Sequence, residues 1–501
     1  MGKKKDGMDR PGQDRLNVHE RKIVYRKPTE VTPEEIVWRK KQNKFLRWLT
    51  SSAPRLITLS FALVILVGTV LLTLPIASAD GTSVGPLKAL FTSTSCTCVT
   101  GLIVGDTATF WSAFGHVVII GLIQIGGLGL ITIMSFFLVA TRKKIGMRAM
   151  LAMQESIGSQ SFSSSRDLVK KIIFFTLSCE LIGGAVLTWR YALRMPFGEA
   201  LRRGVFQGIS AFCNAGFDLM GDFSGPFSSL TKWNDDPIVT LTTAFLIIIG
   251  GLGFVVWDDL LRLRKTKKLH FHSKLVLTMT IFLLAVGTVF FLFVEGNSVG
   301  PDSLGALPVW QRPFAAFFQS ASLRTAGFNS IDQAGLSDTS KLMGCILMFI
   351  GAGPASTGGG VKITSIAVLF ALITSYFRGR DETFLFKHRI SRDVVRRALT
   401  IVFVGLTIVL VSSMLITLTE KQALRDGRFS FLDILYEVIS GFATVGVTSA
   451  GTPTLSAGSW IVLIFNMYLG RVGPASFAMG LTFQQSSDQS LVYPESKTFV
   501  G

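Results

Sequence analysis

The sequence predicts an all-α integral membrane protein made of four repeats around a central pore, each repeat with a span, a short re-entrant pore helix and a second span. The composition indicates the class, because 49% of the residues are hydrophobic, only 16% are charged and the mean hydropathy is +0.48. The architecture follows from four similar segments, each centred on a glycine, that recur about every 115 residues. The distribution of basic residues indicates the topology.

Eight apolar runs reach the length of about 20 residues that crosses a bilayer. They cover residues 56–77, 112–140, 168–192, 237–261, 273–294, 341–376, 393–418 and 458–482. Between the members of each successive pair lies a shorter, half-apolar stretch that ends at a glycine segment. These stretches cover residues 87–98, 199–213, 311–324 and 431–443. We therefore expect eight transmembrane helices and four re-entrant pore helices.

These elements divide the chain into four repeats and two tails. The repeats cover residues 55–145, 146–268, 269–385 and 386–482. Residues 1–54 form a basic N-terminal tail with no apolar run, so no cleaved signal peptide is expected, and residues 483–501 form a C-terminal tail.

Basic residues gather on one side of the predicted membrane. Most of the 50 Lys and Arg residues lie in residues 1–55, 141–171, 261–274 and 378–397. Short cytoplasmic loops carry such an excess, so both termini are expected in the cytoplasm. The net charge of +18 then reflects contact with membrane lipids, or for the N-terminal tail a docking surface for a cytosolic partner, and nucleic acid is not expected as a partner. The sequence identifies no partner for a second cluster on the opposite side, Arg190, Arg194, Arg202 and Arg203.

The glycine segments have the chemistry of an ion pore. A dehydrated alkali cation needs oxygen atoms in place of its water, and rings of backbone carbonyls supply them. Glycine allows backbone angles that turn neighbouring carbonyls toward an axis, and a pore helix aimed at the axis adds the negative end of its dipole. The predicted ion-binding residues are Val99, Thr100, Gly101, Asn214, Ala215, Gly216, Thr325, Ala326, Gly327, Thr444, Val445 and Gly446. Glycines that only pack helices together are the alternative.

Four aspartates follow the glycine segments in the sequence, Asp106, Asp218, Asp222 and Asp332. Acids at the mouth of a pore raise the local concentration of cations. Ordinary solvated loop residues are the competing interpretation.

On these segments the chain resembles the Trk/Ktr/HKT superfamily of potassium transporters, over residues 55–482. The best matches are Ser322-Leu323-Arg324-Thr325-Ala326-Gly327-Phe328-Asn329 and the Thr100-Gly101 pair. The resemblance implies one filter with a single glycine per repeat and K⁺ as the ion bound there. Some relatives pass Na⁺ when the first glycine is a serine, so the intact Gly101 favours K⁺.

Within the superfamily the chain looks most like the Ktr-type membrane subunit, because Trk members usually have additional spans where this chain has a polar tail. That resemblance implies a homodimer with one pore in each protomer, seated on a cytosolic RCK-type ring of nucleotide-binding regulatory subunits like KtrA or TrkA. It also implies potassium uptake, commonly sodium-dependent, across a bacterial plasma membrane. No organic cofactor is expected in this chain.

The sixth predicted span contains a segment that no helix follows smoothly. Five glycines and Pro354 lie within residues 351–360, and proline removes a backbone donor and obstructs the preceding turn. Broken backbone at membrane depth needs protein or water to satisfy it, so we expect the segment beside the pore. A kinked helix with small packing residues is the alternative.

The resemblance assigns this segment the role of an intramembrane gate. The gate residues are Gly351, Gly353, Pro354, Ala355, Ser356, Thr357, Gly358, Gly359, Gly360 and, from the last span, Arg471. A charge inside a span is costly unless it pairs or faces water. The resemblance implies that Arg471 lines the pore below the filter, bonding to carbonyls of the broken span is the competing interpretation, and the two are compatible. Arg324 is expected to pair with a nearby acid, and the glycines of 126–129 and 250–253 are expected at helix-packing sites.

Two other functions are alternatives to potassium transport. A sodium-permeable transporter of the same fold differs only in the ion. An integral membrane enzyme, such as a lipid-linked transferase, would need acids or histidines gathered at one membrane face, whereas the repeated residue here is glycine, which has no catalytic group. The sequence therefore predicts a transporter and not an enzyme.

Overall fold

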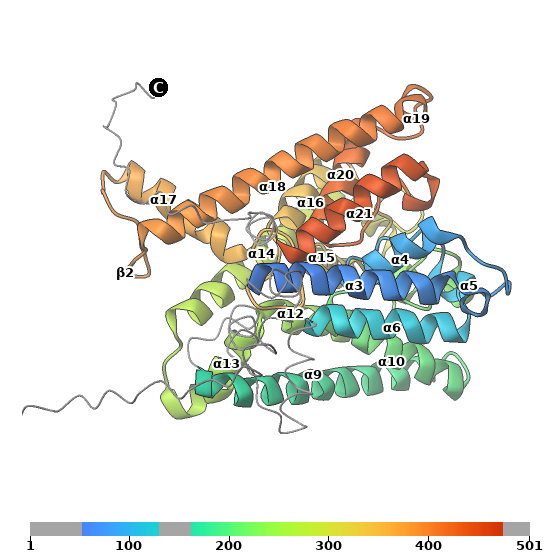
Figure 1. Cartoon of the computed structure of the whole chain (residues 1–501), viewed down its shortest axis with the longest axis horizontal. Coiled ribbons are helices and arrows are strands. Elements are labelled where there is room, and N and C mark those ends of the chain that lie inside the picture. The colour runs from blue at the N-terminus through green and yellow to red at the C-terminus, as the bar shows by residue number, and fades with distance from the viewer. Residues whose placement is uncertain (1–52, 130–161, 474–501) are drawn as a thin grey trace, which may run out of the picture. The chain divides into compact units, whose positions relative to one another are not determined.

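The computed structural model describes residues 53–129 and 162–473. Nearly all of the N-terminal tail, the C-terminal tail, and the parts of the predicted repeats at 130–161 and 474–482 lie outside the described residues. Figure 1 shows that the described chain is almost entirely helical.

In each repeat a long first helix comes before the helix that ends at the glycine segment, and one or more helices follow it (Figure 1). Repeat one contains α3 (Ala53–Thr73), α4 (Pro86–Cys98), α5 (Thr107–Phe110) and α6 (Ala113–Leu128). Repeat two contains α9 (Phe162–Tyr191), α10 (Phe197–Cys213), α11 (Gly221–Ser224), α12 (Pro237–Leu252) and α13 (Phe254–Thr266). Repeat three contains α14 (Phe271–Glu295), α15 (Arg312–Ser322), α16 (Asp338–Phe349) and α17 (Ile363–Phe377). Repeat four contains α18 (Arg392–Thr419), α19 (Lys421–Arg425), α20 (Phe431–Phe442) and α21 (Ala457–Val472).

Short elements connect these helices. The strands β1 (Phe384–Leu385) and β2 (His388–Arg389) form an antiparallel hairpin between α17 and α18. Single 3₁₀ turns lie at Pro75–Ala77, Thr231–Trp233, Leu304–Ala306 and Thr452–Thr454.

The four helices expected to be re-entrant are α4, α10, α15 and α20, and each begins and ends within two residues of its predicted bounds. Local sequence explains where they begin. Pro86 occupies the first position of α4, where proline loses no hydrogen bond. Ser430 and Asp433 form a reciprocal capping box at the start of α20.

Several described helices are suited to a bilayer by length and composition. Within the described residues, α14, α18 and the Lys170–Tyr191 part of α9 are long and apolar enough to cross one. α3, α6, α17 and α21 are apolar but shorter, and the predicted spans of α6 and α21 continue into residues that the structure does not describe. Large apolar side chains such as Phe174, Phe293 and Phe403 are exposed on these helices, as lipid contact requires.

The fourth predicted span, 237–261, is not a straight helix. The helices α12 and α13 meet at an angle of 98°. Gly253 lies between them with φ +97°, a conformation that favours glycine. The same device ends α6 at Gly129 and α21 at Gly473, with φ of +79° and +88°. The sequence predicts packing at the glycines of 126–129 and 250–253, but it does not predict the bend at Gly253.

Packing does occur at the first glycine of each group. A methyl on Gly126 would collide with the carbonyl oxygen of Thr97, and one on Gly250 with that of Phe212. These carbonyls belong to the last turns of the pore helices α4 and α10. The second span of a repeat thus lies directly against the end of the pore helix, which fixes where the following loop begins.

The buried core consists mainly of two clusters. One joins α4, α6, α10 and α12, with Phe212 and Trp233 among its fully buried members. The other joins α14, α16, α20 and α21, with Tyr436 and Phe442. Buried apolar surface on both sides holds the ends of the pore helices in place.

Candidate functional site

Each pore helix ends in the same unusual backbone. The residue two positions before each glycine has a left-handed conformation, with φ of +57° at Val99, +59° at Asn214, +71° at Thr325 and +52° at Thr444. Three of these side chains are β-branched, for which this region is strained. The glycines that follow also have positive φ, so all four loops share one conformation. Strain of this kind persists only where the surrounding structure enforces it.

The four loops meet at their glycines. A methyl on Gly101 would lie 2.6 Å from a carbonyl oxygen of repeat two, and one on Gly216 would lie 2.9 Å from a carbonyl oxygen of repeat three. Methyls on the other two glycines would collide in the same way. The pairs of glycine and carbonyl are Gly101 with Ala215, Gly216 with Ala326, Gly327 with Val445, and Gly446 with Thr100. The contacts run in one direction from repeat to repeat and close on themselves.

This ring presents main-chain oxygens and no ionisable side chain. The contributing carbonyls belong to the residue before each glycine, and the side chains of Thr100, Ala215, Ala326 and Val445 are buried. Carbonyl oxygens at a common axis replace the hydration shell of a monovalent cation. Eight of the twelve residues predicted to bind an ion take part in these contacts, and the other four, Val99, Asn214, Thr325 and Thr444, come directly before them in the chain.

A cavity of about 60 Å³ lies beside the ring, on the side of the residues that follow the glycines. All four glycines line it, together with Asp106 and Asp218. Asp106 is fully engaged, because its carboxylate accepts the N–H groups of Ala108 at 3.1 Å and of Phe227 at 2.9 Å. It thereby ties the loop of repeat two that contains Phe227 to repeat one.

Asp218 differs from the other aspartates. Its carboxylate accepts the N–H of Met220 at 3.0 Å, and burial raises its pKa to about 6. By contrast, Asp222 pairs with Arg203, and Asp332 accepts the N–H groups of its own loop. Only Asp218 among the four thus combines a place in the cavity wall with no structural bond to another repeat in the described residues.

The arginine cluster without an assigned partner pairs with acids of repeat two. Arg190 pairs with Asp236 at 2.8 Å and Arg194 with Asp235 at 2.7 Å. Both partners lie just before α12, so these pairs join the end of α9 to the start of α12.

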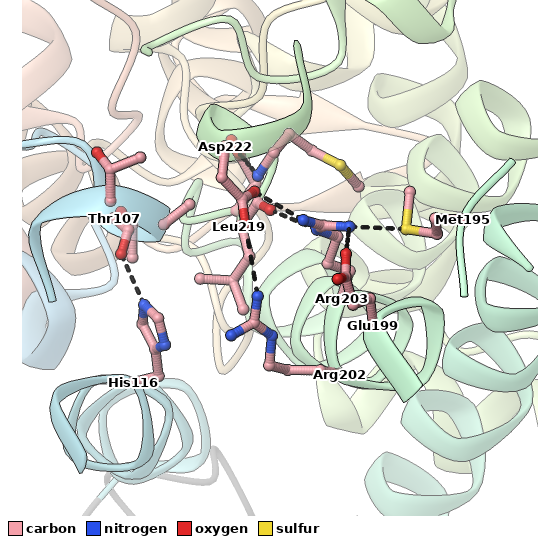
Figure 2. A network of polar contacts seen from close by, with 12 residues as sticks. Thr107, His116, Met195, Glu199, Arg202, Arg203, Leu219 and Asp222 are labelled. Carbon is pink, nitrogen blue, oxygen red and sulfur yellow. Dashed lines mark hydrogen bonds and ion pairs between the residues drawn. The ribbon is translucent and has the colours of Figure 1, made fainter. Parts of the chain in front are cut away.

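Figure 2 shows the other half of the cluster around Arg203. Its guanidinium contacts Glu199 at 2.9 Å and Asp222 at 2.8 Å, and it donates to the carbonyl oxygen of Leu219 at 2.9 Å. Arg203 is only 3% exposed. The bonds fix residues 219–222, the stretch that begins one residue after Asp218. The sequence does not predict the bonds of Arg203 to Leu219 and Asp222, because these residues lie up to nineteen positions away in a loop without a motif.

Residues 351–360 lie between α12 and the glycine loops. The N–H of Gly353 donates to the carbonyl of Gly251 at 2.9 Å, and the hydroxyl of Thr357 donates to the carbonyl of Phe212 at 3.2 Å. A methyl on Gly358 would collide with the side chain of Thr325. A methyl on Gly359 would likewise collide with the side chain of Thr444, so the broken span contacts the end of α10 and the loops of repeats three and four directly, beside the ring.

Two basic side chains hold this segment. Arg471 donates to the carbonyl of Thr357 and to that of Gly126, so it joins the broken span to repeat one. Of the two alternatives for Arg471, bonding to carbonyls of the broken span is the contact present. Lys362 donates to the carbonyl of Gly358 at 2.7 Å. The sequence analysis missed Lys362, although a lysine within an apolar run was a signal that could have found it.

The prediction for Arg324 is wrong. Among the described residues no acid lies within ion-pair distance of its guanidinium, which instead donates to the hydroxyl of Thr280 at 3.4 Å. Arg324 is only 6% exposed, so the span α14 and not a nearby acid supports it.

Comparison with known proteins supports this fold. Residues 37–491 match the TrkH family, described as cation transport protein. The chain is 36% identical over 460 residues to the Ktr system potassium uptake protein B of Bacillus subtilis, covering 92% of this chain and 99% of that protein. It is 38% identical over 450 residues to the protein of the same name from Vibrio alginolyticus, covering 89% and 95%.

Two further matches extend the comparison. The potassium/sodium uptake protein NtpJ of Enterococcus hirae is 35% identical over 451 residues, covering 90% of this chain and 97% of that protein. The crystal structure of the potassium transporter TrkH from Vibrio parahaemolyticus superposes with a TM-score of 0.63 over 84% of each chain at 18% identity, which shows a shared fold. The matched proteins are transporters and not enzymes. The chain belongs to the TrkH family of membrane cation transport proteins.

Proposed function

We propose that this chain takes up potassium ions through the ring of main-chain carbonyls at Thr100, Ala215, Ala326 and Val445. The convergence of four glycine loops of one conformation is the observation that carries the proposal. The names of the relatives from Bacillus subtilis and Vibrio alginolyticus give the ion. The twelve residues of the four loops act as the selectivity filter.

The segment 351–360 acts as a gate in this proposal. Its contacts with the end of α10 and with the loops of repeats three and four support a position in the path of an ion that leaves the ring. Arg471 and Lys362 hold it there through the carbonyls of Thr357 and Gly358. Withdrawal of the segment opens the path.

The wider assembly is also a proposal. The chain works as a homodimer in a bacterial plasma membrane, with both termini in the cytoplasm and a cytosolic RCK-type nucleotide-binding ring as regulator. The phrase "Ktr system" in the names of two relatives supports the presence of partner components. Sodium dependence is tested by measuring rubidium uptake into vesicles while sodium and membrane voltage are varied separately.

The filter is tested by Gly101→Ser and Gly327→Ser. Each places a Cβ against the carbonyl of the next repeat, so the ratio of potassium to sodium uptake in vesicles is expected to fall by about tenfold or more, which corresponds to about 1.4 kcal/mol. Gly81→Ser is the matched control, because Gly81 also has positive φ but nothing lies within 4 Å of its added Cβ. Unchanged selectivity in both filter variants would rule out the filter.

A sodium-permeable transporter is the second candidate, and the relative named potassium/sodium uptake protein favours it. The same vesicles decide between them. Sodium uptake equal to potassium uptake by the unmodified protein would replace the first proposal with the second.

A further inference from the structure

One serine in the last turn of pore helix α4 makes two contacts with the loop that follows. The carbonyl oxygen of Ser95 accepts the N–H of Thr100 at 2.8 Å. Its hydroxyl oxygen accepts the N–H of Gly101 at 3.1 Å. Ser95 is fully buried, so neither N–H has water as an alternative partner.

Every repeat contains such a serine, which the sequence analysis did not single out. Its carbonyl oxygen accepts the N–H of the residue before the glycine in all four repeats, from Thr100 to Ser95, Ala215 to Ser210, Ala326 to Ser322 and Val445 to Ser440, at 2.8 to 2.9 Å. All four serines are fully buried.

The hydroxyl contacts divide the repeats into two kinds. In repeat four the hydroxyl of Ser440 accepts the N–H of Gly446 at 3.0 Å, as in repeat one. In repeat two the hydroxyl of Ser210 accepts the N–H of Phe217, one residue later, at 3.1 Å. In repeat three the hydroxyl of Ser322 donates to the carbonyl of Phe328. In repeats one and four the serine hydroxyl therefore holds the peptide that contains the glycine nitrogen. In the other two repeats it holds a peptide later in the chain.

Peptide geometry converts this bond into a direction for the ring carbonyl. A peptide unit is planar and trans, so its N–H and C=O point in opposite directions. When Ser95 holds the N–H of Gly101 toward the pore helix, the carbonyl of Thr100 in the same peptide must point away from it. That carbonyl lies against Gly446 in the ring.

We infer that Ser95 and Ser440 are positioning residues that set the direction of the Thr100 and Val445 carbonyls. The inference rests on the proposed function, because it assigns these carbonyls to the ion path. Ser210 and Ser322 act on peptides beyond the glycine and contribute less to the direction of the ring carbonyls.

A purely structural role makes a different prediction. A buried hydroxyl that only satisfies an N–H would affect the stability of the fold and leave the choice of ion unchanged. The ratio of potassium to sodium uptake separates the two roles, and it does not depend on how much protein is correctly folded in the vesicles.

The experiment measures this ratio for Ser95→Ala and Ser440→Ala in reconstituted vesicles. We expect the ratio to fall by about tenfold, the factor that corresponds to 1.4 kcal/mol. Ser95→Thr keeps a hydroxyl and is expected to retain most of the selectivity. Ser210→Ala and Ser322→Ala are expected to change the ratio less.

Ser93→Ala is the matched control on the same helix. Ser93 lies two residues before Ser95, and its hydroxyl donates to the carbonyl of Ile65 in α3 at 2.7 Å, away from the loop. Its removal is expected to lower the thermal unfolding temperature while the ratio stays at the unmodified value.

Three outcomes would overturn the inference. Unmodified ratios in Ser95→Ala and Ser440→Ala, alongside a lowered ratio in Gly101→Ser, would refute the serine role and leave the filter standing. A fall in Ser93→Ala as large as that in Ser95→Ala would show a general effect of the helix. Unmodified ratios in all of these variants, Gly101→Ser included, would refute the proposed filter and the inference together.

Discussion

The outer rim of the ring contains carboxylates with different tasks. Asp106 and Asp222 are held by N–H groups or by Arg203, and they shape the loops. Asp218 lines the cavity beside the glycines and is half-buried. A single negative charge at this position attracts cations to the ring, provided that it is ionised.

Uptake is therefore expected to depend on pH through Asp218. Burial raises its pKa to about 6, so the carboxyl is neutral below this value and negative above it. Potassium uptake at subsaturating potassium should rise by about fivefold between pH 5 and pH 7, since one charge contributes about 1 kcal/mol at ~4 Å in water. Asp218→Asn should remove this dependence.

Asp80→Asn is the control for that measurement, because Asp80 is exposed and does not line the cavity. It should keep the pH dependence of the unmodified protein. A pH profile that is the same with and without Asp218 would contradict this role for the carboxylate.

Arg203 is expected to matter for stability more than its neighbour Arg194. Arg203→Met removes the donor to the Leu219 carbonyl and the close partner of Asp222, which keeps its longer contact with Arg202 at 3.6 Å. Hydrogen bonds to charged groups contribute about 2 kcal/mol each. Because Asp222 is partly exposed, we expect a net loss of about 2 to 3 kcal/mol. The midpoint of thermal unfolding in detergent measures this loss.

Arg194→Met is the matched substitution, since the Arg194–Asp235 pair is largely exposed and such pairs contribute about 0 to 1 kcal/mol. Equal losses in the two variants would show that burial of Arg203 has no special consequence.

At the scale of elements, the broken span forms hydrogen bonds with the C-terminal end of α12. The last carbonyls of α12 have no partner within their own helix. Gly251 and Gly250 accept the N–H groups of Gly353 and Thr357, at 2.9 and 3.3 Å. Each such bond contributes about 1 kcal/mol net. A few of them therefore give a free-energy difference of a few kcal/mol between the bound and the withdrawn segment, which is the range of a two-state equilibrium.

Shortening residues 355–360 is expected to raise potassium flux, because it removes the contacts with the end of α10 and with the loops of repeats three and four. Thr357→Val is a milder variant that deletes only the hydroxyl bond to the Phe212 carbonyl, and it should raise flux by about fivefold for a loss of about 1 kcal/mol. Rubidium uptake per reconstituted protein measures both.

Selectivity is the accompanying control, since the filter residues are untouched. An increase in flux with loss of selectivity would indicate a damaged ring. Unaltered or reduced flux in folded variants would argue against a gate.

At the scale of the whole molecule, the ring is the place where all four repeats meet. In the proposed filter, a bound ion would contact a carbonyl from each repeat and link the two buried clusters. A ligand that binds only the folded state stabilises it by about 2.7 kcal/mol at a concentration one hundred times its dissociation constant.

Potassium should therefore raise the thermal unfolding temperature of the purified protein, relative to choline at equal ionic strength. Gly101→Ser should lose most of this gain, whereas Gly81→Ser should keep it. The same gain with choline and potassium would contradict ion binding by the ring.

Sequence patterns predict the helices of the described repeats because those patterns are local. The pore helices were found from half-apolar stretches before a glycine, and the break at 351–360 from glycine and proline content. The bend at Gly253 was missed because a glycine in an apolar run also fits a packing site. The contact of Arg324 with Thr280 and the pair of Arg203 with Asp222 join residues far apart in the sequence, which no local pattern encodes.

The contact between Gly446 and Thr100 has a consequence for how the protein is made. The last loop to leave the ribosome completes a circle that the first loop begins, more than three hundred residues earlier. Until the fourth repeat inserts, the nascent chain has only three of the four loops, and the ring is incomplete on one side. The proposed filter is therefore complete only after the fourth repeat has been made.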